Sequence, residues 1–335
     1  MDDLNFGKRN KRGDWEPFER ISAAPLFEVP TRPVAIAKWI FGWDGYLLPW
    51  NLFYGLVAVA VWLWATPSMA TMQTLAPGWA LFIFARNAAM ISVTSGYLHL
   101  RLYIMKKQGG LFKYNAKWPS KSSDAFLFRD QNKDNMFWTF ISGVPQWTLY
   151  EVLMLWAMAN GYIATLDATA HPVMFAVIMF FIPMFRELHF FMVHRMIHWP
   201  PLYKYVHSLH HANVNPGPWS GIAMHPVEHL FYFSTVLIHA IVPSHPVHVI
   251  FNLVHAGLTP GQGHTGFDKI VNGKTVLNTH GHAHYLHHKY FEVNYADGAL
   301  PLDRWFGSFH DGSPEADSAM EVRMAKRRAT LNRKI

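Results

Sequence analysis

Long apolar segments constrain the fold of this chain more than any other feature of its sequence. A helix that crosses a bilayer needs about 20 mostly apolar residues. The candidate segments are residues 48–66, 74–98, 136–159, 171–185 and 227–258. The fourth of these is short, and Pro243 and Pro246 interrupt the fifth. Segments of this length and composition predict an all-α integral membrane protein.

Composition excludes several other classes of protein. Only 15% of the 335 residues are charged, against about a quarter in soluble proteins. The chain has 21 His and no Cys, which excludes a disulfide scaffold, a Cys-ligated zinc module, an iron–sulfur protein and a thiol nucleophile. The 29 Lys and Arg against 22 Asp and Glu give a net charge of +7. With 14 Trp and long apolar segments, this basic surplus favours a membrane over a nucleic acid as partner.

The distribution of basic residues predicts the topology. Lys and Arg gather at both termini and in residues 101–133, whereas residues 67–75, 160–171 and 241–248 contain none. Basic segments flanking membrane helices remain in the cytosol. We therefore expect transmembrane helical hairpins whose basic connecting segments lie on the cytosolic side. Both termini should be cytoplasmic, in the plasma or inner membrane or the endoplasmic reticulum.

Three histidine clusters predict a metal site. The sequence reads HxxxH at His194 and His198, then HxxHH twice, at His207, His210 and His211 and at His284, His287 and His288. Residues three or four apart share one face of a helix, so each cluster can present two or three imidazoles in the same direction. Neutral imidazole is a good ligand for iron, zinc, copper or nickel. Eight imidazoles exceed what one tetrahedral ion accepts, which implies two metals.

Two other classes remain open on the residues alone. A histidine-rich membrane metal transporter or metal-binding protein is the main alternative, but the apolar segments lack a row of ligating side chains. A b-type cytochrome would place single histidines deep in paired helices rather than in HxxHH clusters. Two non-haem irons per chain would indicate a metalloenzyme. A haem absorption band would indicate the cytochrome, and bound zinc with transport would indicate the transporter.

The three clusters, in this order, resemble the fatty acid hydroxylase/sterol desaturase superfamily of integral membrane di-iron enzymes. The resemblance covers residues 145–311 and includes MHPVEH, GHTGFD and HAHYLHHKYFEVNYADGALPLDRWFGSFHDGS. One departure is Ala296, where the family often has Gly after Asn-Tyr. The resemblance implies two non-haem iron ions, O2 as co-substrate, and hydroxylation or desaturation of a sterol, fatty-acyl or related lipid. It also implies a separate electron donor of the cytochrome b5 or ferredoxin type.

The resemblance also implies a cytosolic, histidine-rich helical cap and its metal ligands, whereas the apolar and basic segments divide the rest of the chain. The implied metal ligands are His194, His198, His207, His210, His211, His264, His284, His287 and His288; no catalytic residue is expected beyond them. Residues 1–47 would form a basic cytosolic segment and residues 48–134 a transmembrane hairpin with a basic cytosolic loop. Residues 135–311 would form the catalytic region, and residues 312–335 a basic tail.

Two alternative roles remain open for several polar residues. Asp268 is either a ligand or an acceptor that orients an imidazole, a role also open to Glu187 and Glu228. The roles of His189, His225, His280 and His282 are undecided. We expect His264 to be a ligand and His229 not, because His264 follows the last apolar segment and precedes a turn at Gly266. Arg86 and Glu151 lie within apolar segments. They form either a buried pair along a substrate tunnel or separate residues near the membrane surface.

Overall fold

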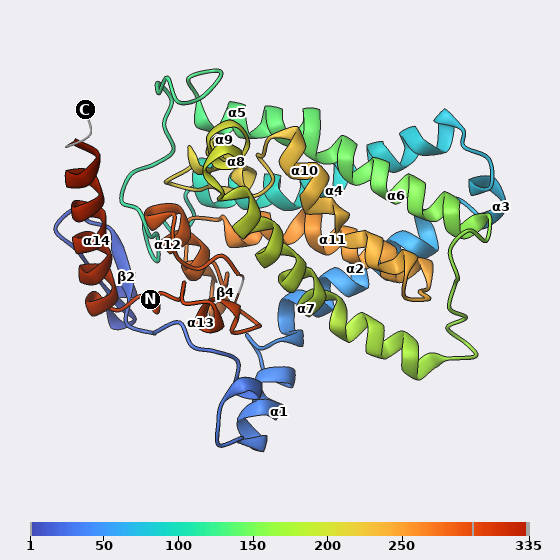
Figure 1. The fold of residues 1–335 in the computed structure, drawn as a ribbon, viewed down its shortest axis with the longest axis horizontal. Helices are drawn as coiled ribbons and strands as arrows, with labels where there is room; N and C mark the ends of the chain where they lie inside the picture. Colours follow the sequence, from blue (N-terminus) through green and yellow to red (C-terminus); the bar gives the residue numbers. More distant parts are fainter. Residues whose placement is uncertain (1, 297, 333–335) are drawn as a thin grey trace.

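The computed structural model describes residues 2–296 and 298–332, which form a mostly helical molecule (Figure 1). Long helices run side by side through one end of the molecule, and short helices with two small hairpins form a cap at the other end. The predicted all-α membrane class is confirmed. The first strand and the last helix both lie at the cap end (Figure 1). The predicted location of the C-terminus concerns residues 333–335, which lie outside the described residues.

Among the described residues, three helices are long and apolar enough to cross a membrane. They span Leu47–Trp64, which contains α2 (Leu52–Trp64), Pro77–Ile104, which contains α4 (Pro77–His99), and α7 (Pro172–Ile197). The expectation that the segment starting at residue 171 is short was wrong, because α7 continues past residue 185. Arg186 and Glu187, which end the apolar segment in the sequence, are buried within the protein. Arg186 donates to the Tyr232 hydroxyl, and Glu187 accepts from two backbone N–H groups, so both polar side chains have partners within the protein and the helix keeps its full length.

Helix α11 (Pro246–Gly263), which contains the second half of the predicted fifth segment, forms the centre of the bundle. It packs against α2, α4, α7 and α6 (Val144–Ala159), and most of its side chains are buried. Gly257 allows this packing, since a Cβ atom there would lie 2.4 Å from the Trp147 ring of α6. The rest of the predicted fifth segment forms α10 (Pro226–Phe233) and a 3-10 helix, Ser234–Ala240.

Arg86 of α4 and Glu151 of α6 form a buried ion pair between two neighbouring helices. Arg86 also donates to the carbonyl oxygen of Ala65, and Asn87 donates to the second carboxylate oxygen of Glu151. Opposite charges that are desolvated together and hydrogen-bonded can persist within an apolar bundle. Of the two interpretations, the structure supports the pair. It does not line the pocket described below.

The cap is assembled from both ends of the chain and from the segments between the long helices. Its helices are α5 (Gln131–Trp138), α8 (Pro200–Leu202), α9 (Ser208–His211), α12 (His282–Tyr290), α13 (Leu302–Trp305) and α14 (Pro314–Asn332). Its antiparallel hairpins pair β1 (Gly7–Arg9) with β2 (Trp15–Pro17), and β3 (Lys269–Asn272) with β4 (Thr275–Asn278). Helices α1 (Pro33–Phe41) and α3 (Met69–Met72) lie outside it.

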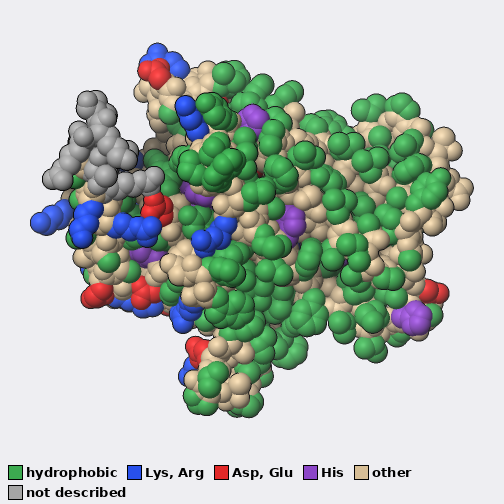
Figure 2. Space-filling view, viewed as in Figure 1, with side chains coloured by type: hydrophobic (Ala, Val, Ile, Leu, Met, Phe, Trp, Pro, Cys, Tyr) green, Lys and Arg blue, Asp and Glu red, His purple; other side chains and the backbone are tan. Residues whose placement is uncertain are grey.

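Charged side chains mark the cap. Figure 2 shows Lys and Arg gathered over the cap, while the face over the long helices is mostly hydrophobic. The N-terminal hairpin belongs to the cap core, because Trp15 packs between Phe112 and Tyr114. The first part of the segment predicted to be basic and cytosolic, residues 1–47, therefore forms a layer of the cap.

Candidate metal centre

All nine histidines expected as ligands lie together at the junction of the cap and the long helices. His194 is in the last turn of α7, and His198 follows the end of that helix. The two HxxHH clusters lie on the π-helical turn and α9 at residues 203–211 and on α12. His264 directly follows α11. One helix end, two short helices and the end of the central helix therefore meet at one place.

The imidazoles form two groups. Their possible ligand atoms lie within 4.8 Å of one another inside each group. The first consists of His194, His198, His207, His211 and His287, and the second of His210, His264, His284 and His288. Each HxxHH cluster gives the pair spaced four residues apart to one group and its middle histidine to the other. Such a division was not expected from the shared helix face.

Nitrogen atoms in the five-histidine group are spaced as ligands of a common ion would be. Nε2 of His287 lies 3.0 Å from Nε2 of His211 and 3.1 Å from Nε2 of His198. With metal–nitrogen distances of about 2.0–2.1 Å, two ligands of one ion lie about 2.9 Å apart at 90° and about 3.4 Å apart at the tetrahedral angle. The observed separations fall within that range.

The nitrogen atoms of the four-histidine group have the same spacing, and their hydrogen bonds also indicate which ring nitrogen carries the proton. Nε2 of His264 lies 3.4 Å from Nε2 of His210 and 3.3 Å from Nε2 of His288. Nδ1 of His264 donates to the carbonyl oxygen of Pro260, and Nδ1 of His210 donates to that of Ala223. A neutral imidazole that donates from Nδ1 carries a lone pair on Nε2. Two lone pairs therefore face each other, an arrangement that a bound cation stabilises.

Burial keeps these imidazoles neutral. It lowers the pKa of His210 to about 4 and that of His264 to about 3, since the charged form loses its hydration. The pKa values of His287 and His288 lie well below 6.5, mainly because of burial and further because neighbouring histidines repel a positive charge. Metal ions bind the neutral form of imidazole, so no proton has to leave these histidines before a metal binds near neutral pH.

Oxygen atoms accept hydrogen bonds from Nδ1 of three imidazoles in the five-histidine group and so orient these rings. Glu228 of α10 accepts a hydrogen bond from Nδ1 of His207 at 2.8 Å, and both side chains are buried. Nδ1 of His194 donates to the carbonyl oxygen of Tyr295 at 2.8 Å, and that of His287 to the carbonyl oxygen of Val293 at 2.6 Å. Each of these bonds directs Nε2 into the group. The buried Nε2 atoms of His194 and His207 have no hydrogen-bond partner among the described residues.

His229 lies outside both groups and uses both of its ring nitrogens elsewhere. Nδ1 lies 2.9 Å from Ser142 Oγ, and Nε2 lies 3.1 Å from the carbonyl oxygen of Ile222. His225 caps the start of α10, where its Nδ1 accepts from the backbone N–H of Val227. These contacts are structural, and they support the expectation that His229 is not a ligand.

The remaining undecided residues also lie outside the two groups. His189 contacts Ser234 Oγ at 3.0 Å. Asp268 accepts from the Tyr114 hydroxyl at 2.8 Å. Glu187 accepts from the backbone N–H groups of Gly298 and Leu300. Of the three carboxylates considered as orienting groups, Glu228 is the one with a described contact to a histidine of the two groups, namely His207.

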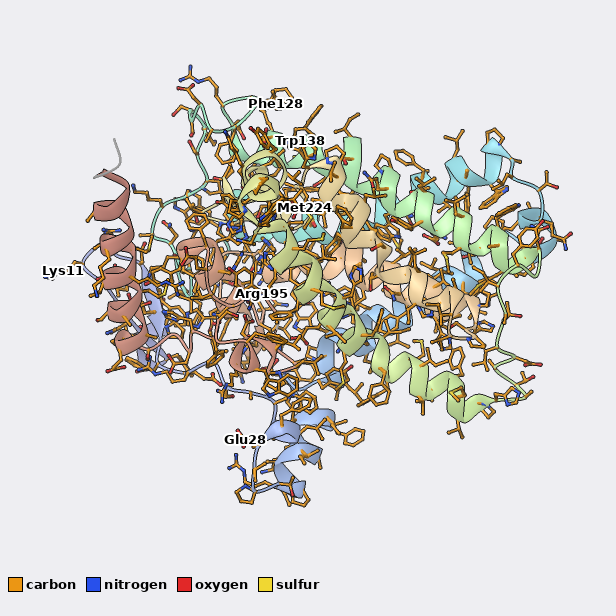
Figure 3. The ribbon with its side chains drawn as sticks, in the orientation of Figure 1. Lys11, Glu28, Phe128, Trp138, Arg195 and Met224 are labelled. Atoms are coloured by element: carbon orange, nitrogen blue, oxygen red, sulfur yellow. The ribbon has the colours of Figure 1, made fainter. Side chains whose placement is uncertain are left out.

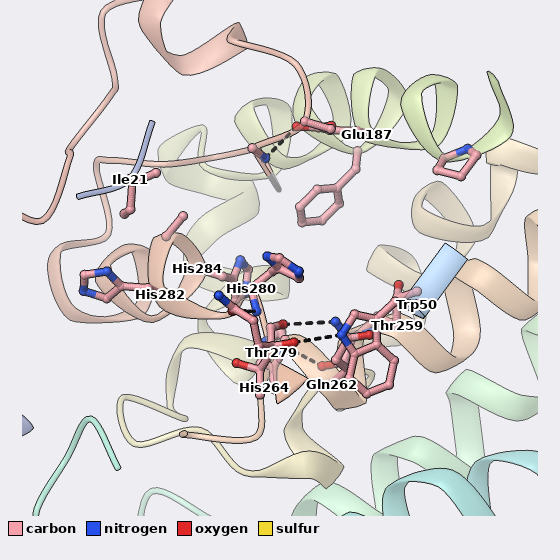
Figure 4. A pocket seen from close by; sticks show the side chains of 18 of the residues that line it. Ile21, Trp50, Glu187, Thr259, Gln262, His264, Thr279, His280, His282 and His284 are labelled. Atoms are coloured by element: carbon pink, nitrogen blue, oxygen red, sulfur yellow. Dashed lines mark hydrogen bonds between the residues drawn. The ribbon is translucent and has the colours of Figure 1, made fainter. Parts of the chain in front are cut away.

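A pocket of about 560 Å³ adjoins the histidines. Its inner wall includes His194, His207, His210, His264 and His284, together with apolar residues of α7 and α11. Figure 4 shows His264, His280, His282 and His284 on one side of this space and Glu187 on the other. The volume is typical of a small-molecule site. Residues 19–25 and 44–46 form its outer wall; sequence reasoning missed them because they carry no metal-binding pattern.

Tyr295 was also missed. Its ring lies 5.5 Å from that of His194, 4.9 Å from that of His198 and 5.2 Å from that of His287. The Asn-Tyr dipeptide in the resembling segment was the available signal. The residue thus packs against the five-histidine group with its ring and orients His194 with its backbone.

Comparison with known proteins adds an independent finding. Residues 177–308, which contain all nine histidines, match the family model described as fatty acid hydroxylase. The chain is similar to the Delta(7)-sterol 5(6)-desaturase ERG3B of Gibberella zeae, with 34% identity over 143 residues that cover 41% of this chain and 43% of that protein. The Delta(7)-sterol 5(6)-desaturase erg3C of Aspergillus fumigatus is 29% identical over 167 residues, covering 42% of this chain and 52% of that protein.

A third similar protein is the Delta(7)-sterol 5(6)-desaturase of Candida glabrata, with 31% identity over 133 residues, 37% of this chain and 34% of that protein. The chain thus spans about half or less of the length of these relatives. No solved structure matches the chain.

Proposed function

We propose that the chain belongs to the fatty acid hydroxylase/sterol desaturase superfamily and that it is a membrane-bound non-haem di-iron oxidoreductase. In this proposal it hydroxylates or desaturates a lipid with O2 and with electrons from a separate cytochrome b5 or ferredoxin type of donor. The observation that carries the proposal is the pair of largely buried histidine groups beside a pocket of about 560 Å³. Their nitrogen separations of 3.0–3.4 Å fit two bound ions.

The ligand assignment follows the two groups. His194, His198, His207, His211 and His287 would hold one ion, and His210, His264, His284 and His288 the other. Two iron ions, when bound, would supply the O2-dependent oxidation of an unactivated C–H bond. An all-nitrogen set fits iron and zinc alike, so the family and not the ligand set favours iron.

The protein's own residues prepare the site. Glu228 holds the proton on Nδ1 of His207, which keeps Nε2 available as a ligand. Phe190, Met224 and Tyr232 supply apolar surface beside the histidines and reduce the access of water. The pocket touches α7, one of the candidate membrane-spanning helices, so a lipid can place its chain near the metals without leaving the membrane environment.

The alternative metal transporter is less well supported. Both groups that could hold a metal, among the described residues, lie at the cap end of the long helices. A transport path would need ligands at successive depths along the membrane helices. The histidines instead converge on one enclosed place next to a pocket.

The test measures metal and product together. Purified protein should contain about two non-haem iron ions per chain, without a haem absorption band. His210→Ala and His287→Ala should each lower the iron content and abolish activity, whereas His171→Ala, at an exposed position, should do neither. Lipidomics of cells with and without the gene should find a product that differs from its precursor by one oxygen or two hydrogens. Normal turnover in either site variant, or stable zinc loading with metal transport, would refute the proposal.

A further inference from the structure

Helix α1 is apolar at eight of its nine positions, yet the protein fully buries none of its residues. Its sequence, PVAIAKWIF, contains one charged residue, Lys38. A helix that is apolar all round is normally buried. In Figure 1, α1 projects from the body of the molecule beside the start of α2, and Figure 3 shows Glu28 on the same projecting segment. The apolar surface of this helix therefore needs a partner outside the described chain.

The flanking residues extend the same surface. Val34 is 69% exposed and Phe41 67%, and on either side of the helix Val29 is 94% and Trp43 60% exposed. Arg32, at the start of the helix, forms an ion pair with Glu28. An apolar surface of this kind bordered by a few charged groups marks a contact site.

The position of α1 in the chain identifies the partner as the membrane. The candidate membrane span that contains α2 begins at Leu47, shortly after α1 ends at Phe41. Nine residues at 1.5 Å each give a helix of about 14 Å, half of the roughly 30 Å of a bilayer's hydrocarbon core. The helix is thus too short to cross, and it is joined directly to one that is long enough. Helices that lie at the membrane surface have this combination of Trp, aliphatic and basic side chains.

The inner side of α1 reaches the pocket. Trp39 lines the pocket and packs against Tyr46, with ring centroids 5.1 Å apart. The hydroxyl of Tyr46 donates to the carbonyl oxygen of Phe180 on α7 at 2.6 Å. This contact fixes the segment between α1 and α2 against a membrane helix. One side of α1 therefore borders the pocket while the other is exposed.

We propose that α1 lies in the membrane interface, with Val34 and Phe41 among the lipids, and forms the lip of the pocket. The pocket then opens toward the leaflet, and its ligand enters past α1 without crossing water. The membrane contact stands on the exposed apolar surface alone, whereas the access of a lipid substrate rests on the proposed function. The proposal divides residues 1–47, expected to be cytosolic throughout, into a cap layer and a membrane-bound part.

The absence of cysteine makes the membrane contact directly testable. Val34→Cys and Phe41→Cys would carry a nitroxide spin label in the full-length holoenzyme, reconstituted in phosphatidylcholine–phosphatidylglycerol nanodiscs. Power-saturation EPR would compare the access of O2, which concentrates in lipid, with that of a water-soluble nickel chelate. Leu56→Cys, exposed on α2, is the lipid reference, and Ser122→Cys, in an exposed loop, is the water reference.

Labels on α1 should show the high ratio of oxygen to nickel access found at Leu56→Cys. A ratio like that of Ser122→Cys would place α1 in water and overturn the proposal. Poor access of both reagents would show that protein, such as a second copy of the chain, covers the helix, and this would also overturn it. None of these results depends on enzymatic activity, so failure of the proposed function leaves the measurement valid.

The access route has its own test in an active enzyme. The double variant Val34→Asp/Phe41→Asp should raise the KM about tenfold or more for the precursor lipid that lipidomics identifies, presented in nanodiscs, because two apolar side chains no longer hold the lip in the lipid phase. Its kcat and iron content should not change. Val322→Asp, at an exposed position on α14, is the matched control. An unchanged KM in the double variant would overturn the role of α1 in substrate access.

Discussion

Replacing His264 and His229 one at a time by alanine tests whether His264 is a metal ligand and His229 a residue that makes only protein contacts. Both side chains are buried, and both belong to segments next to the site. His264 contributes Nε2 to the four-histidine group and takes no part in the other. His264→Ala should therefore lower the iron content from two ions to about one per chain and abolish activity, while the protein still inserts into membranes.

His229→Ala should instead lower the stability of the protein and leave its iron content unchanged. The substitution leaves the hydroxyl of Ser142 and the carbonyl oxygen of Ile222 without their partner. An unsatisfied buried polar group costs roughly 1–3 kcal/mol, so two such groups should lower the free energy of unfolding by roughly 2–6 kcal/mol. The iron content should stay near two per chain, with a moderate decrease in rate.

Two measurements decide the comparison. Elemental analysis gives the ratio of iron to protein, and thermal unfolding in detergent gives the stability. His171→Ala, at an exposed position, should match the wild type in both. The reasoning would be refuted if His229→Ala lost iron while His264→Ala kept both ions. A high-resolution map with Nε2 or Nδ1 of His229 within about 2.0–2.3 Å of a metal would refute it equally.

Three further predictions follow from individual contacts. Glu228→Leu should weaken iron binding about 10- to 100-fold by removing the acceptor of a ligand histidine, as measured by chelator competition; equal affinity in variant and wild type would exclude an orienting role. Gly257→Ala should lower stability by about 1–3 kcal/mol, because a Cβ atom would collide with Trp147; Gly78→Ala, where the space is open, is the control, and equal unfolding temperatures would contradict the predicted collision. Metal-free protein should lose thermal stability as the pH falls from about 6.5 to 4, since burial lowers the folded-state pKa of His210 to about 4 and only the unfolded chain takes up the proton in that window; a flat profile would contradict it.

The sequence by itself determined the membrane class and predicted that the three histidine clusters share a metal site. Hydrophobic length is a local property, so the helices α2 and α4 were evident from residues 48–66 and 74–98. Imidazole is a specific ligand, and its spacing in three clusters indicated a shared site. The end of α7 was missed for an equally local reason: Arg186 and Glu187 appear unfavourable in a membrane until their buried surroundings are known.

Only the tertiary structure decided how the histidines are divided and what surrounds them. The helical repeat determines which side chains share a face, but it does not determine which distant side chain meets them. His198 and His287 are 89 residues apart in the chain, and Nε2 of one lies 3.1 Å from Nε2 of the other. The contact of His207 with Glu228 and the pocket wall formed by residues 19–25 likewise join distant segments. Such contacts depend on how elements pack, and packing is a property of the whole chain rather than of any one segment.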